Sequence, residues 1–584
     1  MAEEFLESKY TLWIVGAVGG VLFLTTNLPS QLDDYDQAKQ AFTSFEMIKE
    51  GHWFYQRTPH ERVATKPPLV GWISAGTFAI TRSWNIAWRL PSLLAALAIS
   101  FMLFRAAASF EQGGSFRLFP RACSHGPMGR RGNRGILPGE RPKGGGHSTC
   151  TTPLSLQGVG AEKSEGSSTS LPIVALIATS AFVFNLLSPR LATLVRTDMP
   201  LTLVIFAIGF LIWEKIRERE QWNSRGRLWI FALLTAAMLI KGPIVYAFLL
   251  PGIAMFEWRR RKAESIRTWC GWWPWVASLG IFLVWVIGGS FFVPGFFDQV
   301  VMREFLARFG ETVHRPQPLL FYLPHLLHKF FPWSVLMIAL AIIDLRARQW
   351  KIGAALREMA PATVWLVCWI FGGLIVMSII PSKRVDRVFP IIPPLCLLLA
   401  VQIGKSSTPF RYGPAWRVRS PSMSPDIELT DHPPPQSFGE ASSPLATGNE
   451  MMRARVLRWS LVALLASILF TSSYTVAKIV SGYRAHRDAL VSFGHAVRDE
   501  AAAHQWRYEV LKTGDEGLLL YLERMHFIEP QRAIAQWNRG NLDAVVAPVQ
   551  MAPNLMRDLH DAALSRLKST LGKRESGNYV LITR

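Results

Sequence analysis

The feature that most constrains this chain is a series of long apolar runs separated by short loops rich in lysine and arginine. Half of the 584 residues are hydrophobic, including 22 tryptophans and 35 phenylalanines. A soluble domain does not need so many apolar runs, whereas a run of about 20 residues can cross a bilayer as a helix. The pattern therefore predicts a polytopic α-helical membrane protein with about 11 to 13 transmembrane helices.

The basic loops predict how these spans are oriented. Counted from a cytoplasmic N-terminus, the spans place every strongly basic loop on the cytoplasmic side, as the positive-inside rule requires. The net charge of +21 is thus a topology signal and does not indicate nucleic-acid binding. The candidate spans lie near residues 10–27, 88–107, 171–188, 200–213, 229–241, 244–257, 273–293, 329–344, 361–380, 388–404 and 456–478.

One apolar segment, residues 69–80, does not fit this count as a full span. If it crossed the membrane, Asp198 would lie on the face opposite Asp33, and every later basic loop would lie outside. We therefore expect a helix that dips into the membrane, lies along its outer surface or forms half of a broken pair.

Composition divides the chain into a membrane domain, polar connections and a soluble domain. Residues 1–405 form the predicted transmembrane catalytic domain, interrupted at 113–170 by a segment with too little apolar content to fold. Residues 406–455 are predicted to be a flexible cytoplasmic linker before the last span, 456–478.

Residues 485–584 have the composition of a small soluble α/β domain, which we expect on the outer, periplasmic face of the membrane. Strands are expected at 508–511, 517–522, 542–549 and 578–582, and helices at 489–503 and 553–571.

The candidate site begins directly after the first span. Residues 28–69 form a predicted outer loop that carries Asp33, Asp34 and Lys66 at the membrane edge, where charge is expensive and indicates a functional site by default. The other candidate charges on the same predicted face are Asp198, Arg303, Arg308, Lys383, Arg384 and Arg387.

Each candidate also has a structural alternative. Asp33 or Asp34 can cap a helix that begins at Tyr35, and Asp198 can cap the helix that Pro200 starts. Lys66 can extend its amine from an apolar surface into water. For the arginines and Lys383, the alternatives are contact with lipid headgroups and anchoring at the interface.

Short motifs in a fixed order connect these candidates. This order resembles that of the ArnT-type branch of the protein-mannosyltransferase-like glycosyltransferases over roughly residues 10–405. The resemblance implies a GT-C fold, a periplasmic active site in the bacterial inner membrane and an undecaprenyl- or polyprenyl-phosphate sugar donor. In the lipid A branch the donor carries aminoarabinose. The motifs are Asp33-Asp34, Gly51-His52-Trp53, Lys66-Pro67-Pro68-Leu69, Arg89-Leu90-Pro91-Ser92, Thr197-Asp198-Met199-Pro200, Lys241-Gly242-Pro243, Arg303-Glu304, Phe331-Pro332-Trp333-Ser334 and Ser382-Lys383-Arg384.

The chemistry that this resemblance implies assigns roles to the charged residues. An acceptor hydroxyl must lose its proton as it attacks the anomeric carbon, and we expect the Asp33 carboxylate to accept that proton. The phosphate that leaves needs fixed cations, first Lys66 and then Arg308 and Arg303. Asp198 is expected to position the acceptor or the donor sugar. We expect an inverting transfer to lipid A, another envelope glycan or a protein hydroxyl.

The chain departs from the family pattern at a few positions. Asp36 and Gln37 stand where relatives commonly carry a cation, and Arg387 is expected to restore positive charge near the phosphate. Thr65 and Phe305 replace potential metal ligands, so a divalent metal stays an open expectation. Two other functions are kept as alternatives: a transporter or flippase of a lipid-linked saccharide, and a scaffold without catalysis.

Overall fold

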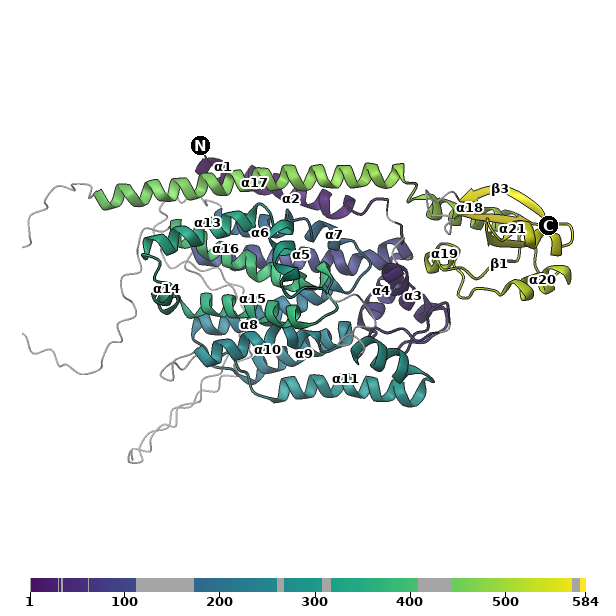
Figure 1. The fold of residues 1–584 in the computed structure, drawn as a ribbon, viewed down its shortest axis with the longest axis horizontal. Helices are drawn as coiled ribbons and strands as arrows, with labels where there is room; N and C mark the ends of the chain where they lie inside the picture. The colour runs from purple at the N-terminus through teal and green to yellow at the C-terminus, as the bar shows by residue number, and fades with distance from the viewer. Residues whose placement is uncertain are drawn as a thin grey trace, which may run out of the picture.

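The computed structural model describes residues 2–29, 31–32, 35–60, 62–111, 173–259, 267–306, 317–407, 444–569 and 578–584. A bundle of apolar helices carries a small α/β domain at one end (Figure 1). The segment 113–170, predicted to be unfolded, lies outside the described residues. The linker prediction was wrong from residue 444 onward, because helix α17 begins at Pro444 and continues to Arg484.

The predicted class, a polytopic helical membrane fold, is confirmed. By length and hydropathy, six of the described helices can each cross a bilayer, and a seventh span results if a pair bent by 101° counts as one. The bundle contains α1 (Ala2–Glu7), α2 (Lys9–Thr25), α3 (Tyr35–Lys49), α4 (Leu69–Thr81), α5 (Trp84–Glu111), α6 (Ile173–Val183), α7 (Ser188–Ala192), α8 (Asp198–Glu218), α9 (Ser224–Lys241), α10 (Ile244–Arg259), α11 (Trp273–Phe292), η1 (Phe297–Leu306), η2 (Leu319–Phe321), α12 (Tyr322–Lys329), α13 (Trp333–Ala347), α14 (Ile352–Glu358), α15 (Pro361–Ile379), η3 (Val385–Ile391), α16 (Ile392–Ser407) and α17.

Helix α4 explains the apolar segment that did not fit the span count. It has 13 residues, and at about 1.5 Å per residue it is shorter than the hydrocarbon core, which is about 30 Å thick. It ends where Arg82 adopts the left-handed conformation, with φ 53°. Helix α4 therefore does not cross a membrane alone, in line with the expectation of a partial or surface helix.

Glycine lets two central helices approach each other closely. A Cβ atom built on Gly372 of α15 would lie 2.5 Å from the backbone nitrogen of Gly252 in α10. A Cβ atom on Gly252 would lie 2.8 Å from the Cα atom of Trp369. Any larger residue would separate these backbones, so α10 and α15 use the small-residue packing common between membrane helices.

The C-terminal domain has a four-stranded sheet in the order β1-β2-β4-β3, in which β1 and β2 are parallel and the other pairs antiparallel. Val546 and Leu581 are opposite each other and face α18, whereas Val545 and Ile582 face α20 and α21. Both faces are therefore covered, which explains the continuous apolar run of β2. The elements are α18 (Ala489–His504), β1 (Tyr508–Val510), α19 (Glu516–Tyr521), α20 (Pro530–Asn538), β2 (Ala544–Pro548), α21 (Ala552–Asp558), β3 (Ala563–Ser569) and β4 (Tyr579–Thr583).

Two predicted elements of this domain were wrong. The strand predicted over 517–522 is instead helix α19 (Glu516–Tyr521), because a short run of leucines has no periodicity that distinguishes a strand from a helix, and leucine favours helices. The helix predicted over 553–571 ends at Asp558, and strand β3 follows. The break lies at Asp561, whose φ of 55° is left-handed.

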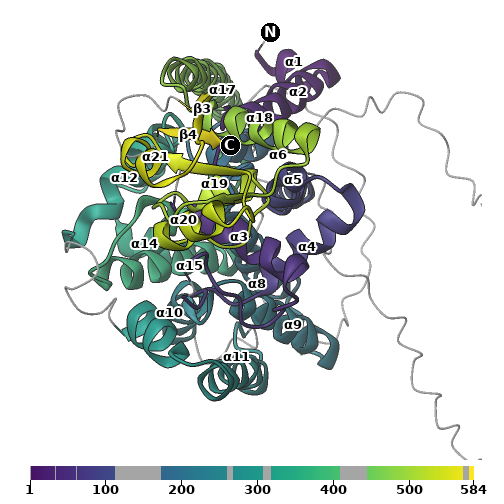
Figure 2. The same cartoon turned by 90° about the vertical axis from the view of Figure 1, so that its right-hand side faces the viewer.

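The α/β domain is docked on α3, which the view along the bundle places behind it (Figure 2). Phe42 and Phe45 of α3 belong to the same apolar cluster as Phe493 and Val546 of the domain. The backbone N–H of Leu32 donates to the Tyr521 hydroxyl at 2.6 Å, so the chain just before α3 is also held by the domain. The domain therefore helps to position the beginning of α3.

Glu516, at the start of α19, predicts a pH-dependent stability. Its side chain is buried, and neither carboxylate oxygen has a hydrogen-bond partner among the described residues. Burial raises the pKa of Glu516 from 4.5 to about 7, against an opposing effect of Lys39. Between these values the folded chain keeps a proton that the unfolded chain releases, so stability falls as pH rises, by about 3 kcal/mol in total.

We therefore expect Glu516→Gln to raise the thermal unfolding temperature at pH 8 and to change it little at pH 5. The measurement is thermal unfolding of the purified chain in detergent across this pH range. Glu500→Gln, at an exposed position of α18, is the matched control. If the unfolding temperatures of Glu516→Gln and the unmodified chain changed with pH in the same way, the prediction would be wrong.

Candidate active site

Asp36, at the beginning of α3, lies where several charged segments meet. Its Oδ2 atom accepts a hydrogen bond from Nη1 of Arg384 at 2.5 Å and lies 3.7 Å from Nη2 of Arg196. The segment that carries Arg196 is held against α3, because the N–H of Val195 donates to Gln37 at 3.3 Å. Residues more than 150 positions apart in sequence thus meet at one carboxylate.

A second carboxylate, Asp386 in η3, extends this arrangement. Its Oδ2 atom accepts from Nη1 of Arg196 at 2.8 Å, and its Oδ1 atom lies 3.7 Å from Nη1 of Arg190 in α7. Only 8% of the Arg196 side chain and 10% of the Asp386 side chain are exposed. We call Asp36, Arg190, Arg196, Arg384 and Asp386 the ion-pair network.

Asp198 is held beside this network by a separate cation. It is the first residue of α8, and its carboxylate accepts from the Lys241 amine at the end of α9. Both side chains are largely buried, and Asp198 is close enough for Arg196 and Arg384 to act on it electrostatically. Lys241 therefore neutralises Asp198, which suits a positioning role better than that of a free base.

Lys66 is held by a tight loop rather than by a helix. The N–H of Thr58 donates to the carbonyl of Arg62 at 2.6 Å, and that of Ala64 to the carbonyl of Gln56 at 2.7 Å. The buried pair Pro67-Pro68 follows and leads into α4. This loop brings the partly buried Lys66 close enough to Asp36 to act on its charge.

The arginines keep Asp36 ionised. Burial alone would raise the pKa of Asp36, but the hydrogen bond from Arg384 and the charges of Arg384, Arg196 and Lys66 lower it below its ordinary value. Burial would lower the pKa of Arg384, and Asp36 reverses this and raises it. Both groups are therefore charged at neutral pH, and the low pKa makes Asp36 a weak proton acceptor.

The structure brings some of the predicted site residues together. Lys66, Asp198 and Arg384 lie at or beside the network, as described above. Arg387 Nη1 donates to the carbonyl oxygen of Ser382 at 2.5 Å, within the same turn of chain. The buried Lys383 points elsewhere, since its amine donates to the carbonyl oxygen of Gln317 at 2.9 Å.

The remaining predicted residues are not placed at the network. Arg303 is exposed on η1 and makes none of the ion pairs found among the described residues. Asp33, Asp34 and Arg308 lie outside the described residues. No structural role is therefore assigned to these three.

Sequence reasoning missed several members of the site. Arg190, Arg196 and Asp386 were not proposed, Lys241 was noticed only as part of a motif, and Asp36 only as a departure from the family pattern. The signal available was their position: an ionisable residue in or beside an apolar run is a functional candidate by default. The missing cation near Asp36 is supplied by other segments of the chain.

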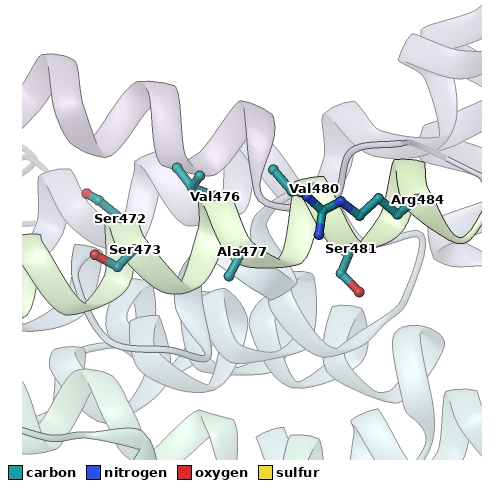
Figure 3. A pocket seen from close by; sticks show the side chains of 7 residues that line it. All are labelled: Ser472, Ser473, Val476, Ala477, Val480, Ser481 and Arg484. Carbon is teal, nitrogen blue, oxygen red and sulfur yellow. The ribbon is translucent and has the colours of Figure 1, made fainter.

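Two other features of the described residues lie apart from the network. The one group of three or more potential metal ligands found there is Glu46, Glu50 and His52, toward the other end of α3. An open groove on α17 is lined by side chains of that helix alone (Figure 3). The groove contains no residue of the network; its lining residues are Ser472, Ser473, Val476, Ala477, Val480, Ser481 and Arg484.

Comparison with curated proteins finds similarity to one group of transferases. The undecaprenyl phosphate-α-4-amino-4-deoxy-L-arabinose arabinosyl transferase of Shewanella sediminis is 26% identical over 230 residues, which cover 39% of this chain and 40% of that protein. A protein of the same name, numbered 1, from Sodalis glossinidius is 27% identical over 185 residues, or 30% of this chain and 31% of that protein. The alignments thus span less than half of these relatives. No protein-family model matches the chain.

Comparison with solved structures covers nearly the whole chain. The crystal structure of ArnT from Cupriavidus metallidurans bound to undecaprenyl phosphate aligns with 98% of this chain and 97% of that one, with a TM-score of 0.58 and 15% identity. The same protein in the apo state aligns with a TM-score of 0.55 and 16% identity. The match includes the bundle and the C-terminal domain. The chain therefore has the GT-C membrane fold of these ArnT crystal structures.

Proposed function

We propose that this chain is a glycosyltransferase that moves a sugar from an undecaprenyl- or polyprenyl-phosphate donor to an envelope acceptor. The reaction is placed at the end of the bundle that carries the ion-pair network, on the periplasmic side of the bacterial inner membrane. The observation that carries the proposal is the convergence of Lys66, Arg196 and Arg384 at the beginning of α3. Similarity to proteins named as undecaprenyl phosphate-dependent transferases supports it.

The cations suit the group that leaves. As the bond between the anomeric carbon and the phosphate oxygen breaks, its electron pair stays on the polyprenyl phosphate, whose charge grows. Arg196 and Arg384 are held by Asp36, so they are already oriented before a substrate arrives. Lys66 adds a compact charge beside them, and fixed cations in a partly dry site stabilise a phosphate strongly.

The acceptor hydroxyl gives its proton to a carboxylate as its oxygen attacks the anomeric carbon from the opposite side, which inverts the configuration. Asp33 stays the proposed base. In the sequence it stands three residues before Asp36. Asp36 and Asp198 suit this task less well, because the arginines lower the pKa of Asp36 and make it a weak proton acceptor, and Asp198 is paired with Lys241.

The test is reconstitution of the purified chain in lipid vesicles with a labelled polyprenyl-phosphate sugar and extracted lipid A, glycan or protein acceptors. Lys66→Ala is expected to lower the transfer rate about 10- to 100-fold, because one charge-assisted contact to phosphate is lost. Lys66→Arg should recover part of the rate. Asp33→Asn should abolish transfer. Asp36→Asn should not abolish it, because Asp36 is not the proposed base.

Unchanged transfer in both Lys66→Ala and Asp33→Asn would overturn this mechanism. Movement of the labelled lipid across the vesicle membrane without any transfer would indicate the flippase alternative instead. Arg348→Ala removes an exposed ion pair with Asp344 in another part of the bundle and serves as the control for expression and folding.

A further inference from the structure

A second cluster of ionisable side chains lies at the contact between α3 and the C-terminal domain. Glu46 and Glu50 are near the C-terminal end of α3, His52 follows it, and His526 lies in the connection between α19 and α20. Asp36 lies ten residues before Glu46 on the same helix, which corresponds to about 15 Å. The cluster is therefore separate from the ion-pair network.

The donor atoms of this cluster face one another. Nδ1 of His52 lies 3.0 Å from Oε1 of Glu46 and 3.6 Å from Oε2 of Glu50. The ligand atoms of these three residues all lie within 4.8 Å of one another. Nε2 of His526 lies 2.7 Å from Oε1 of Glu50, so the domain places a further potential donor beside Glu50, outside the group of three.

These separations are those of a site that can close around one ion. Zinc bonds to nitrogen and carboxylate oxygen at about 2.0–2.2 Å, so two ligand atoms of a tetrahedral site lie about 3.3 Å apart. The three separations given above, 2.7 to 3.6 Å, lie on either side of this value. Small side-chain rotations therefore suffice to bring Glu46, Glu50 and His52 to one centre, and a larger movement of His526, which contacts Glu50, completes a set of four donors.

Burial and outer contacts make Glu46 more than a surface carboxylate. Its side chain is 1% exposed, and its second oxygen accepts from the backbone N–H of Arg57 at 2.5 Å. Such an outer hydrogen bond is what orients a carboxylate that binds a metal. A bound cation would offset the cost of burying this carboxylate.

We propose that Glu46, Glu50, His52 and His526 bind one divalent transition-metal ion of the zinc class, which ties the C-terminal domain to the end of α3. Two imidazoles and two carboxylates favour such an ion over Mg²⁺, which prefers oxygen and water. The site is structural, because it involves no residue of the ion-pair network and all four donors come from the protein. The proposal does not depend on the glycosyltransferase activity.

The experiment uses the full chain in detergent, purified with a tag that contains no histidine and treated with a chelator. Zn²⁺ content after dialysis and Co²⁺ absorption spectra then report binding. We expect one equivalent per chain and the visible absorption of tetrahedral Co²⁺. We also expect a rise in the unfolding temperature with Zn²⁺ but not with Mg²⁺. His52→Ala and His526→Ala should each weaken binding by more than about 100-fold, beyond the usual effect of an outer contact.

His504→Ala is the matched control, because His504 is exposed in the same domain and lies 3.6 Å from Glu500 without a third ligand among the described residues. The His504→Ala variant should bind Zn²⁺ as the unmodified chain does. If His52→Ala does not fold, Glu50→Gln tests the same site with a side chain of similar shape. Less than one equivalent in the unmodified chain, or binding unaffected by the His52 and His526 variants, would overturn the proposal. If His52→Ala lost Zn²⁺ binding and His526→Ala did not, the proposed role of the C-terminal domain in the site would be overturned.

Discussion

Replacing Arg196 by alanine is expected to destabilise the folded chain by about 3–5 kcal/mol, because the buried Asp386 then keeps its charge without its main partner. Arg196 donates to Asp386 at 2.8 Å and also lies 3.7 Å from Asp36. Arg190 is too far from Asp386 for a hydrogen bond, at 3.7 Å, and compensates only in part. The measurement is thermal or denaturant unfolding of the purified chain in detergent, compared with the unmodified protein.

A double variant separates the roles of this pair in stability and in transfer. Arg196→Leu with Asp386→Leu removes both buried charges together, and apolar replacement of a buried pair is often neutral or stabilising. We expect this variant to recover most of the stability and none of the transfer activity. Equal destabilisation by the single and the double variant would show that burial of an unpaired charge is not the cause.

Replacing Arg384 by alanine is expected to lower the transfer rate about 10²- to 10³-fold while it changes stability little. The Arg384 side chain is 40% exposed and its partner Asp36 is 43% exposed, so solvent screens the loss of the pair in the folded chain. During transfer, a fixed cation near the leaving phosphate stabilises charge that exists only as the bond breaks. The loss should therefore appear mainly in kcat.

The measurement is transfer kinetics in vesicles together with the unfolding temperature of the same preparations. Arg384→Lys keeps a positive charge but loses the planar guanidinium, so we expect an intermediate rate. Arg348→Ala, which removes a partly exposed arginine that pairs with Asp344 in another part of the bundle, should transfer at the normal rate. A rate near normal in Arg384→Ala would remove Arg384 from the proposed site.

Local properties of the sequence determined the general architecture. Long apolar runs, basic loops and the beginning of α3 at Tyr35 depend on residues close together in the chain, and the helices follow them. The same reasoning failed where local signals are weak. Residues 517–522 are apolar without a period, and the helix predicted over 553–571 is interrupted near Asp561.

Only the tertiary structure decided which charges form the site. The sequence identified Lys66, Asp198 and Arg384, but not that Asp36, Arg196 and Asp386 would meet them. Helix periodicity describes which residues share a face of one helix, whereas an ion pair between positions 36 and 384 depends on how distant helices pack. In the same way, His526 approaches Glu50 only because the C-terminal domain docks on α3, a contact between segments 476 residues apart.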